Sequence, residues 1–239
     1  MRPGDPVLEV GAGLGSLTVA LAEAGCRVLA IELDRGLAEA LQEVCAPYAD
    51  RVRVLIADAM RADWAALLPG GGWAMVSNLP YNISVPLLLD LFRSVPQIGR
   101  FLVMVQREVG DRLVAVPGEE AYGAVSVRVA YHADARIVRR VPAEVFWPRP
   151  KVDSVLVRAL PHPPPVDVDP LALFTVVEQG FAERRKTMGN ALRRLGLDAA
   201  SALRVMNVSG LDPQVRAERL GLSEFTWITR TLLAEGWRP

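Results

Sequence analysis

Short apolar runs rich in β-branched residues alternate with helix-like patterns along the first part of this 239-residue chain. Strands that alternate with helices in this way predict an α/β fold with a mostly parallel, doubly wound sheet. The last two expected strands lie close together in the sequence, which favours an antiparallel edge. The expected strands are 6–10, 27–34, 51–58, 74–78, 100–106, 124–133 and 153–160, and the expected helices are 16–25, 36–48, 84–95 and 108–116.

A proline-rich stretch, LPHPPPVDVDP at 160–170, interrupts this alternation and reads as a stiff linker. Beyond it the chain shows only helical patterns, separated by glycines. We therefore expect two domains: a sheet-containing domain over 1–165 and a small all-helical domain over 171–239.

Composition excludes some classes of protein. No apolar run is long enough to cross a membrane, and the N-terminus lacks the apolar core of a signal peptide. Cys26 and Cys45 lie in apolar stretches, so we expect neither a disulfide framework nor a metal site, and a reducing cytoplasm is the default. The formal net charge is zero, but residues 136–158 carry six basic and two acidic groups. Such a segment suits either a polyanion or ordinary solvated surface.

A glycine-rich turn, VGAGLGS at 10–16, follows the first expected strand and opens a helix. Glycines allow a tight turn and a close approach to a ligand, and a helix N-terminus offers free N–H groups. The spacing of Gly11, Gly13 and Gly15 differs from the pattern of pyrophosphate-binding loops. Alone, the loop is also compatible with an ordinary α/β turn.

Polar side chains close the next three strands at the edge where ligands bind in open α/β sheets. Glu32 ends the second strand and can accept hydrogen bonds from ribose hydroxyls, while Asp58 ends the third and can accept from an adenine amino group. Asn78 ends the fourth. This order resembles the Rossmann-like methyltransferases that use S-adenosyl-L-methionine, a class in which the glycine loop lies against the methionine part of the cofactor.

The stretch NLPY at 78–81 suits chemistry on an aromatic amine. Such an amine is a poor nucleophile because its lone pair is delocalised into the ring. The Asn78 side-chain oxygen and the Leu79 carbonyl can accept hydrogen bonds from its two N–H groups, and the base can stack on the Tyr81 ring. The simpler reading is a strand-to-loop turn with a packed tyrosine.

Longer motifs make the resemblance specific. NLPYNIS (78–84) looks like the version of this motif in the rRNA adenine N6-dimethyltransferases, EVFWPRPKVDSVLVR (144–158) resembles their F-x-P-x-P-x-V-x-S block, and GFAERRKTMGNAL (180–192) resembles their F-x-x-R-R-K-T-x-x-N-x-L helix. The resemblance implies that Phe146 stacks on the target adenine opposite Tyr81, with Asn78 also beside the cofactor. It further implies RNA contacts for five cations: Arg149, Lys151, Arg184, Arg185 and Lys186.

The resemblance implies N6,N6-dimethylation of two adjacent adenosines in the 3′-terminal hairpin of small-subunit (16S) rRNA, by a cytoplasmic monomer that needs no metal. Three alternatives stay open at this point: a large-subunit (23S) rRNA dimethyltransferase, a ribosome-assembly factor without catalysis, and a nicotinamide-dependent dehydrogenase. Family members usually carry a further segment, with a Q-x-F-L motif, ahead of the first strand. Here that strand begins almost at Met1, so we expect a more exposed cofactor.

Overall fold

The computed structural model describes residues 1–147, 149–183 and 185–239. The contacts between its residues divide the chain into two compact units. The first contains Met1–Gly110 and Ala133–Pro161, and the second contains Asp111–His132 and His162–Pro239.

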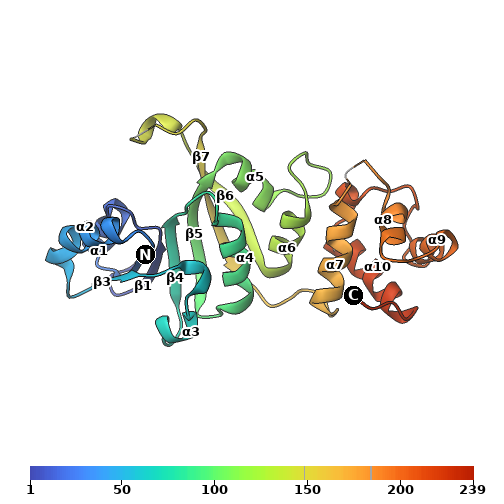
Figure 1. Ribbon diagram of the computed structural model, residues 1–239, viewed down its shortest axis with the longest axis horizontal. Coiled ribbons are helices and arrows are strands. Elements are labelled where there is room, and N and C mark those ends of the chain that lie inside the picture. The colour runs from blue at the N-terminus through green and yellow to red at the C-terminus, as the bar shows by residue number, and fades with distance from the viewer. Residues whose placement is uncertain (148, 184) are drawn as a thin grey trace. The chain divides into compact units, whose positions relative to one another are not determined.

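The first unit is built on a seven-stranded sheet with the order β3-β2-β1-β4-β5-β7-β6. The pairs among β1 to β5 are parallel, while β7 runs antiparallel to both β5 and β6, so the expected antiparallel edge is confirmed. Figure 1 shows the sheet and labels its strands, apart from β2. The strands are β1 (Pro6–Val10), β2 (Arg27–Glu32), β3 (Val52–Ile56), β4 (Trp73–Asn78), β5 (Ile98–Gln106), β6 (Ala133–Val141) and β7 (Ser154–Pro161).

Helices connect the parallel strands, as the alternating pattern predicts. α4 lies against β5, where the rings of Phe92 and Phe101 meet edge to face with centroids 4.7 Å apart (Figure 1). The helices of this part of the chain are α1 (Ser16–Glu23), α2 (Arg35–Cys45), α3 (Trp64–Leu67), α4 (Ser84–Ser94) and α5 (Arg107–Val114), with 3₁₀ turns at Ala46–Tyr48, Ala59–Arg61 and Ala143–Val145.

One strand prediction is wrong. Residues 124–133 were expected to form a strand, but Ala124–His132 form helix α6, and the strand that pairs with β7 is the following segment, β6. In the helix, Val127 and Tyr131 lie one turn apart and both side chains enter the core of the second unit. Burial on one helical face therefore outweighs the β-branched composition of this segment.

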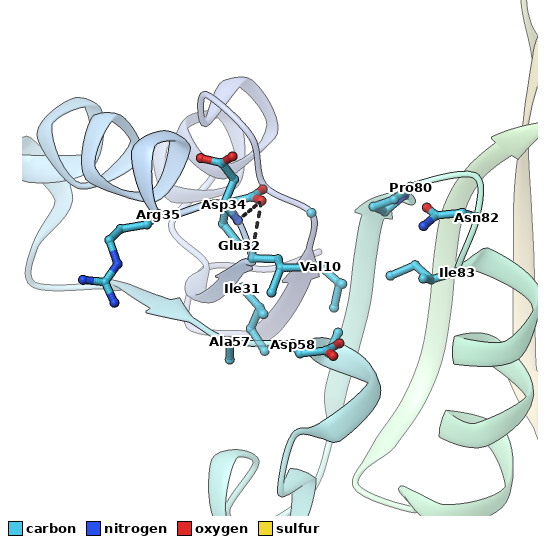
Figure 2. Close-up of a pocket in the computed structure, with 13 residues that line it drawn as sticks. Val10, Ile31, Glu32, Asp34, Arg35, Ala57, Asp58, Pro80, Asn82 and Ile83 are labelled. Carbon is cyan, nitrogen blue, oxygen red and sulfur yellow. Dashed lines mark hydrogen bonds between the residues drawn. The ribbon is translucent and has the colours of Figure 1, made fainter.

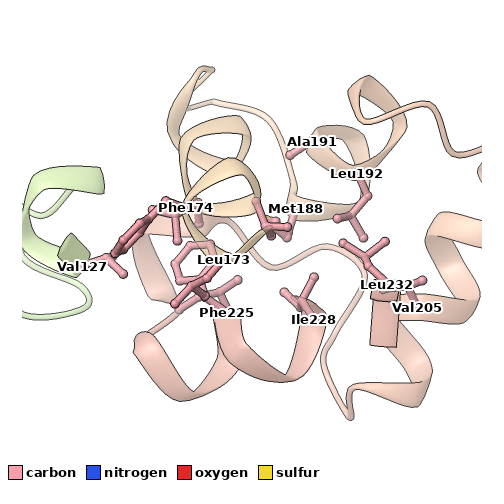
Figure 3. Close-up of a cluster of buried hydrophobic side chains, with 14 of the residues drawn as sticks. Val127, Leu173, Phe174, Met188, Ala191, Leu192, Val205, Phe225, Ile228 and Leu232 are labelled. Atoms are coloured by element: carbon pink, nitrogen blue, oxygen red, sulfur yellow. The ribbon is translucent and has the colours of Figure 1, made fainter. Parts of the chain in front are cut away.

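The second unit is helical and has its own hydrophobic core. Figure 3 shows Val127 of α6 beside Phe174, together with Leu173, Met188, Phe225 and Ile228 in one buried cluster. The segment 111–132, which we expected within the first domain, thus belongs with the C-terminal helices. Those helices are α7 (Pro170–Phe181), α8 (Met188–Arg194), α9 (Ala199–Val208) and α10 (Leu222–Ala234), with a 3₁₀ turn at Ala217–Arg219. In the described parts of the chain, every helix is too short or too polar to cross a membrane.

Candidate active site

The carboxyl ends of the parallel strands bring the predicted site residues to one edge of the sheet. The register pairs Val10 with Ile31 and Glu32 with Ile56. The glycine loop after β1, Glu32 at the end of β2 and Asp58 just after β3 are therefore neighbours. The strand order reverses between β1 and β4, which is where ligands bind in sheets of this type.

The Ser77 side chain links β1 and β4 at the point where the two strands separate. The two strands are paired at Val7 with Ala74 and at Leu8 with Met75, and the ladder ends there. Beyond it, the Val10 N–H donates to the Ser77 hydroxyl over 2.9 Å. Ser77 thus replaces a backbone acceptor and joins the start of the glycine loop to the end of β4. Sequence reasoning missed this residue, because a serine inside an apolar strand carries no signal of its own.

The glycine loop lies directly against the NLPY turn. Gly11 has φ of +74°, and a Cβ built on it would stand 2.9 Å from two carbons of the Pro80 ring. Gly15, with φ of +88°, precedes α1, and a Cβ there would stand 2.7 Å from Leu41. Gly13 has φ of +55° and only open space within 4 Å of its Cβ position. Two of these glycines are thus required by close packing, while the third faces space that a ligand can fill.

Glu32 organises the loop with its carboxylate. Its Oε2 accepts the Gly13 N–H over 2.9 Å, and its Oε1 accepts the N–H groups of Leu33 and Asp34 over 2.9 and 3.0 Å. A carboxylate has about four acceptor positions, so one remains for a ligand hydroxyl. Only 8% of Glu32 is exposed. The side chain therefore has a fixed orientation before any ligand binds.

A cavity of about 570 Å³ lies in front of these groups. Its volume is typical of a site for a small organic ligand. Figure 2 shows Glu32, Ile31 and Asp58 on one side and Pro80, Asn82 and Ile83 on the other. Asp58 caps the turn that follows β3, with its Oδ1 accepting the Met60 N–H over 2.9 Å, while its Oδ2 lies 3.8 Å from the Arg61 Nε. The cavity-lining Asn82 and Ile83 lie within the motif but were not singled out from the sequence.

The NLPY turn leaves two oxygen acceptors available. The Leu79 N–H donates to the Met104 carbonyl over 3.1 Å, and its side chain is buried. Over the described residues, neither the Asn78 side chain nor the Leu79 carbonyl receives a hydrogen bond. Asn78 is exposed, and Tyr81 is 46% exposed, so the Tyr81 ring is available for stacking.

Phe146 lies on a segment that rises from the same sheet edge. Ser154 at the start of β7 pairs with Gln106 at the end of β5 and with Val141 at the end of β6. Residues 142–147 therefore leave the sheet at its carboxyl edge and residues 149–153 return to it, and Figure 1 shows these stretches projecting past β7. Phe146 itself is half-buried and does not line the 570 Å³ cavity.

The predicted RNA-binding cations are exposed where the structure describes them. Arg149 forms an ion pair with Glu144, while Lys151, Arg185 and Lys186 face solvent, and Arg184 lies outside the described residues. The expected helix over this block is interrupted: α7 ends at Phe181, and Thr187 caps the new helix α8. Lys186 lines a hollow of about 490 Å³ that also includes Asn190, Arg193 and Arg194.

Glu9 is a buried acid that sequence reasoning missed. It lies in β1, only 1% exposed, and its Oε2 accepts the Thr18 hydroxyl over 2.7 Å. Burial raises the pKa of this carboxyl from 4.5 to about 7, although the Thr18 hydrogen bond acts in the other direction. Glu9 thus ties β1 to α1 beneath the glycine loop.

The sheet order, the glycine loop against the NLPY turn and the acid at the end of β2 define a Rossmann-like methyltransferase with a helical C-terminal part. Residues 1–231 match the family model described as ribosomal RNA adenine dimethylase, and the chain belongs to this family. Methyltransferases of the family use S-adenosyl-L-methionine. The residues present fit this cofactor, because the cavity is lined by Gly11 of the loop and by Glu32 and Asp58, whose carboxylates can accept further hydrogen bonds.

Named relatives and solved structures agree with this family. Ribosomal RNA small subunit methyltransferase A of Thermobifida fusca (strain YX) is 45% identical over 233 residues, which are 95% of this chain and 80% of that protein. The protein of the same name from Moorella thermoacetica is 42% identical over 96% of this chain and 83% of its own length.

Among solved structures, a dimethyladenosine transferase from Plasmodium falciparum superposes with a TM-score of 0.77 at 21% identity, covering 99% of this chain and 93% of that one. The 23S rRNA methyltransferase ErmE superposes with a TM-score of 0.70 at 24% identity, covering 97% of this chain and 92% of that one. Both structures share the fold.

Proposed function

We propose that this protein transfers methyl groups to N6 of two adjacent adenosines in the 3′-terminal hairpin of small-subunit (16S) rRNA, giving N6,N6-dimethyladenosine during ribosome biogenesis. Membership of the ribosomal RNA adenine dimethylase family supports the reaction. The names of relatives that are 42–45% identical over nearly the whole chain support the small subunit as the substrate. The protein acts in the cytoplasm as a monomer and without a metal.

The contact between Gly11 and Pro80 carries this proposal. It places the glycine loop, which suits a cofactor, directly against the turn that suits an aromatic amine. A methyl donor and its acceptor must lie within a few ångströms of each other, and this contact supplies that proximity.

The cofactor is held by the edge of the sheet. Glu32 accepts a hydrogen bond from one of its ribose hydroxyls, and Asp58 accepts from its adenine amino group. The loop from Gly11 to Gly15 contacts the methionine part of the cofactor, and Asn78 contacts the same part. When bound, S-adenosyl-L-methionine supplies a methyl group attached to a positively charged sulfur. Because of this charge, the methyl group can leave the sulfur without help from a metal.

The NLPY turn prepares the nucleophile. Asn78 Oδ1 and the Leu79 carbonyl, which receive no hydrogen bond within the described structure, accept the two N–H bonds of the adenosine N6. This arrangement withdraws the nitrogen lone pair from the ring and directs it toward the methyl group. The nitrogen then releases one proton to solvent for each methyl group that it gains. Tyr81 and Phe146 stack on the two faces of the base, which must leave its helix to reach the site.

The cations position the RNA rather than read its sequence. Arg149 and Lys151 on the segment before β7 contact phosphates near the target. Arg184, Arg185 and Lys186 contact other rRNA phosphates, so the helical part over 171–239 acts as an rRNA-binding domain.

Labelled methyl transfer tests the substrate. The protein is incubated with S-adenosyl-L-methionine and small subunits that lack the modification, and large subunits serve as the control. We expect N6,N6-dimethyladenosine at two adjacent positions of the small-subunit rRNA only. Labelling of large subunits alone would make this a 23S rRNA enzyme. Tight binding of cofactor and subunits without any transfer would support an assembly factor instead.

A further inference from the structure

Trp147 is the most exposed large apolar side chain among the described residues. It is 97% exposed, although tryptophans are usually among the well-buried residues. Val145 and Val152 on the same segment are 66% and 45% exposed. Three exposed apolar side chains on one short segment are more typical of a binding surface than of ordinary solvated surface.

Trp147 differs from its neighbour Phe146 in burial. Phe146 is half-buried, whereas Trp147 is 97% exposed. The Trp147 ring is therefore fully accessible to a ligand that Phe146 meets only in part.

Cations that form no ion pair with the described residues lie close to this segment in the sequence and the sheet. Arg139 and Arg140 lie near the end of β6, next to Val141, which pairs with Ser154 at the carboxyl edge of the sheet. Both are exposed, as is Lys151. Within the parts of the chain that the structure describes, no carboxylate lies within ion-pair distance of these three side chains.

Protection of a sheet edge explains only part of this arrangement. Charged residues on an edge strand such as β6 do discourage association between sheets. That role accounts for Arg139 and Arg140, but an edge that is protected by charge gains nothing from an exposed indole beside it. Unpaired cations with an exposed aromatic ring are instead the combination that binds single-stranded nucleic acid.

We propose that Trp147 stacks on an unpaired base next to the methylated adenosine, while Lys151 and one of the two arginines, Arg139 or Arg140, contact phosphates of the same strand. This inference rests on the proposed function and deepens it, because it gives the enzyme a second stacking surface for the adjacent nucleotide. The shared sheet edge places this surface on the same side as the methyl-transfer site.

Equilibrium binding to small subunits that lack the modification tests the stacking role. A Trp147→Ala variant should bind roughly 5- to 100-fold more weakly, which is the range expected for loss of one base–aromatic stack. Trp147→Phe should restore most of the affinity, and Val44→Ala, which trims a 46% exposed apolar side chain on α2, should have no effect. Cofactor affinity, measured by titration calorimetry, should stay the same in all three variants.

The salt dependence of the same binding tests the cations. Arg139→Gln and Arg140→Gln are measured separately, because these side chains leave opposite faces of β6. One of the two variants should make the slope of log affinity against log salt less steep by about 0.7, which corresponds to one lost contact with a single-stranded phosphate. Arg53→Gln, at an exposed position on β3, should leave the slope unchanged.

Wild-type affinity in Trp147→Ala would overturn the inference even if the wild-type enzyme methylates its substrate. A Trp147→Ala variant that loses binding to anionic lipid vesicles but keeps its affinity for RNA would also overturn the inference. That result would indicate that Trp147 contacts a membrane. A wild-type enzyme that binds subunits through Trp147 but transfers no methyl group would contradict the proposed function and leave this surface supported.

Discussion

Gly11 shows how a single residue can hold two motifs together. Its positive φ disfavours any side chain, and its Cβ position is already occupied by the Pro80 ring. Most glycine turns impose only the first of these restrictions. Here the second restriction links the cofactor loop to the substrate turn, so a change at Gly11 should disturb both.

A Gly11→Ala substitution should therefore destabilise the protein by more than about 2 kcal/mol, since the left-handed conformation alone costs about 1–2 kcal/mol. Gly4→Ala is the matched control, because Gly4 has φ of +85° and nothing within 4 Å of its Cβ position. Chemical denaturation of both variants measures the difference. Equal destabilisation of the two would show that the contact with Pro80 has no energetic importance.

Glu9 predicts a dependence of stability on pH. Its pKa is about 7 in the folded chain against an ordinary value of 4.5, so between these pH values the folded state keeps a proton that the unfolded state has lost. The free energy of unfolding therefore falls as the pH rises through this window, by an amount on the order of 2–3 kcal/mol.

Replacing Glu9 with glutamine should remove this penalty while keeping an acceptor for Thr18. We expect Glu9→Gln to match the wild type in melting temperature near pH 4.5 and to exceed it at pH 8. Glu43→Gln, at an exposed position on α2, should show no such trend. A wild-type curve that does not fall relative to Glu9→Gln would mean that Glu9 is ionised when buried.

At the scale of elements, the separation of β1 from β4 creates the site, and Ser77 stabilises the point where they part. Ser77→Ala would leave the buried Val10 N–H without an acceptor, which costs about 1–3 kcal/mol. We expect lower stability together with weaker cofactor binding, because the glycine loop begins at Val10. Ser94→Ala, at the exposed end of α4, is the control. Unchanged cofactor affinity in Ser77→Ala would restrict the residue to a purely structural role.

The sequence allowed the elements around the site to be predicted better than those away from it. β1, β2 and β4 combine buried apolar runs with a polar last residue or a glycine turn, so local pattern and final position agree. The segment 124–132 has alternating valines but forms a helix, because its partners come from residues far along the chain. β6 was missed since an edge strand with three arginines lacks the apolar alternation of a buried one.

The site was predictable as a set of positions but not as a geometry. Motifs identified Glu32, Asp58 and Asn78 because polar residues at strand ends are visible in the sequence. The contact of Gly11 with Pro80, and the two hydrogen bonds made by Glu9 and Ser77, depend on strand order, which local patterns do not contain. The break in the block with Arg185 and Lys186 depends on the cap at Thr187.

At the scale of the whole molecule, residues 111–132 come early in the chain but share a core with its end. A fragment that stops at Pro161 should therefore leave the side chains of Tyr122, Val127 and Tyr131 without their partners. We expect a protease to cut this fragment first within 111–132, at a rate at least tenfold above that for the full chain. Equal resistance of the fragment and the full chain would support a boundary near residue 165 instead.

The central claim is that one site brings the cofactor loop and the NLPY turn together for methyl transfer. Its most direct test compares Asn78→Ala with the wild type in two measurements: the single-turnover rate of methyl transfer to unmodified small subunits, and the cofactor dissociation constant. We predict a rate at least about 10²-fold lower, as for the loss of one positioned hydrogen-bonding group, with a dissociation constant within about fivefold. Asn207→Ala, at an exposed position on α9, should behave as wild type. An Asn78→Ala variant that methylates at the wild-type rate would contradict the account.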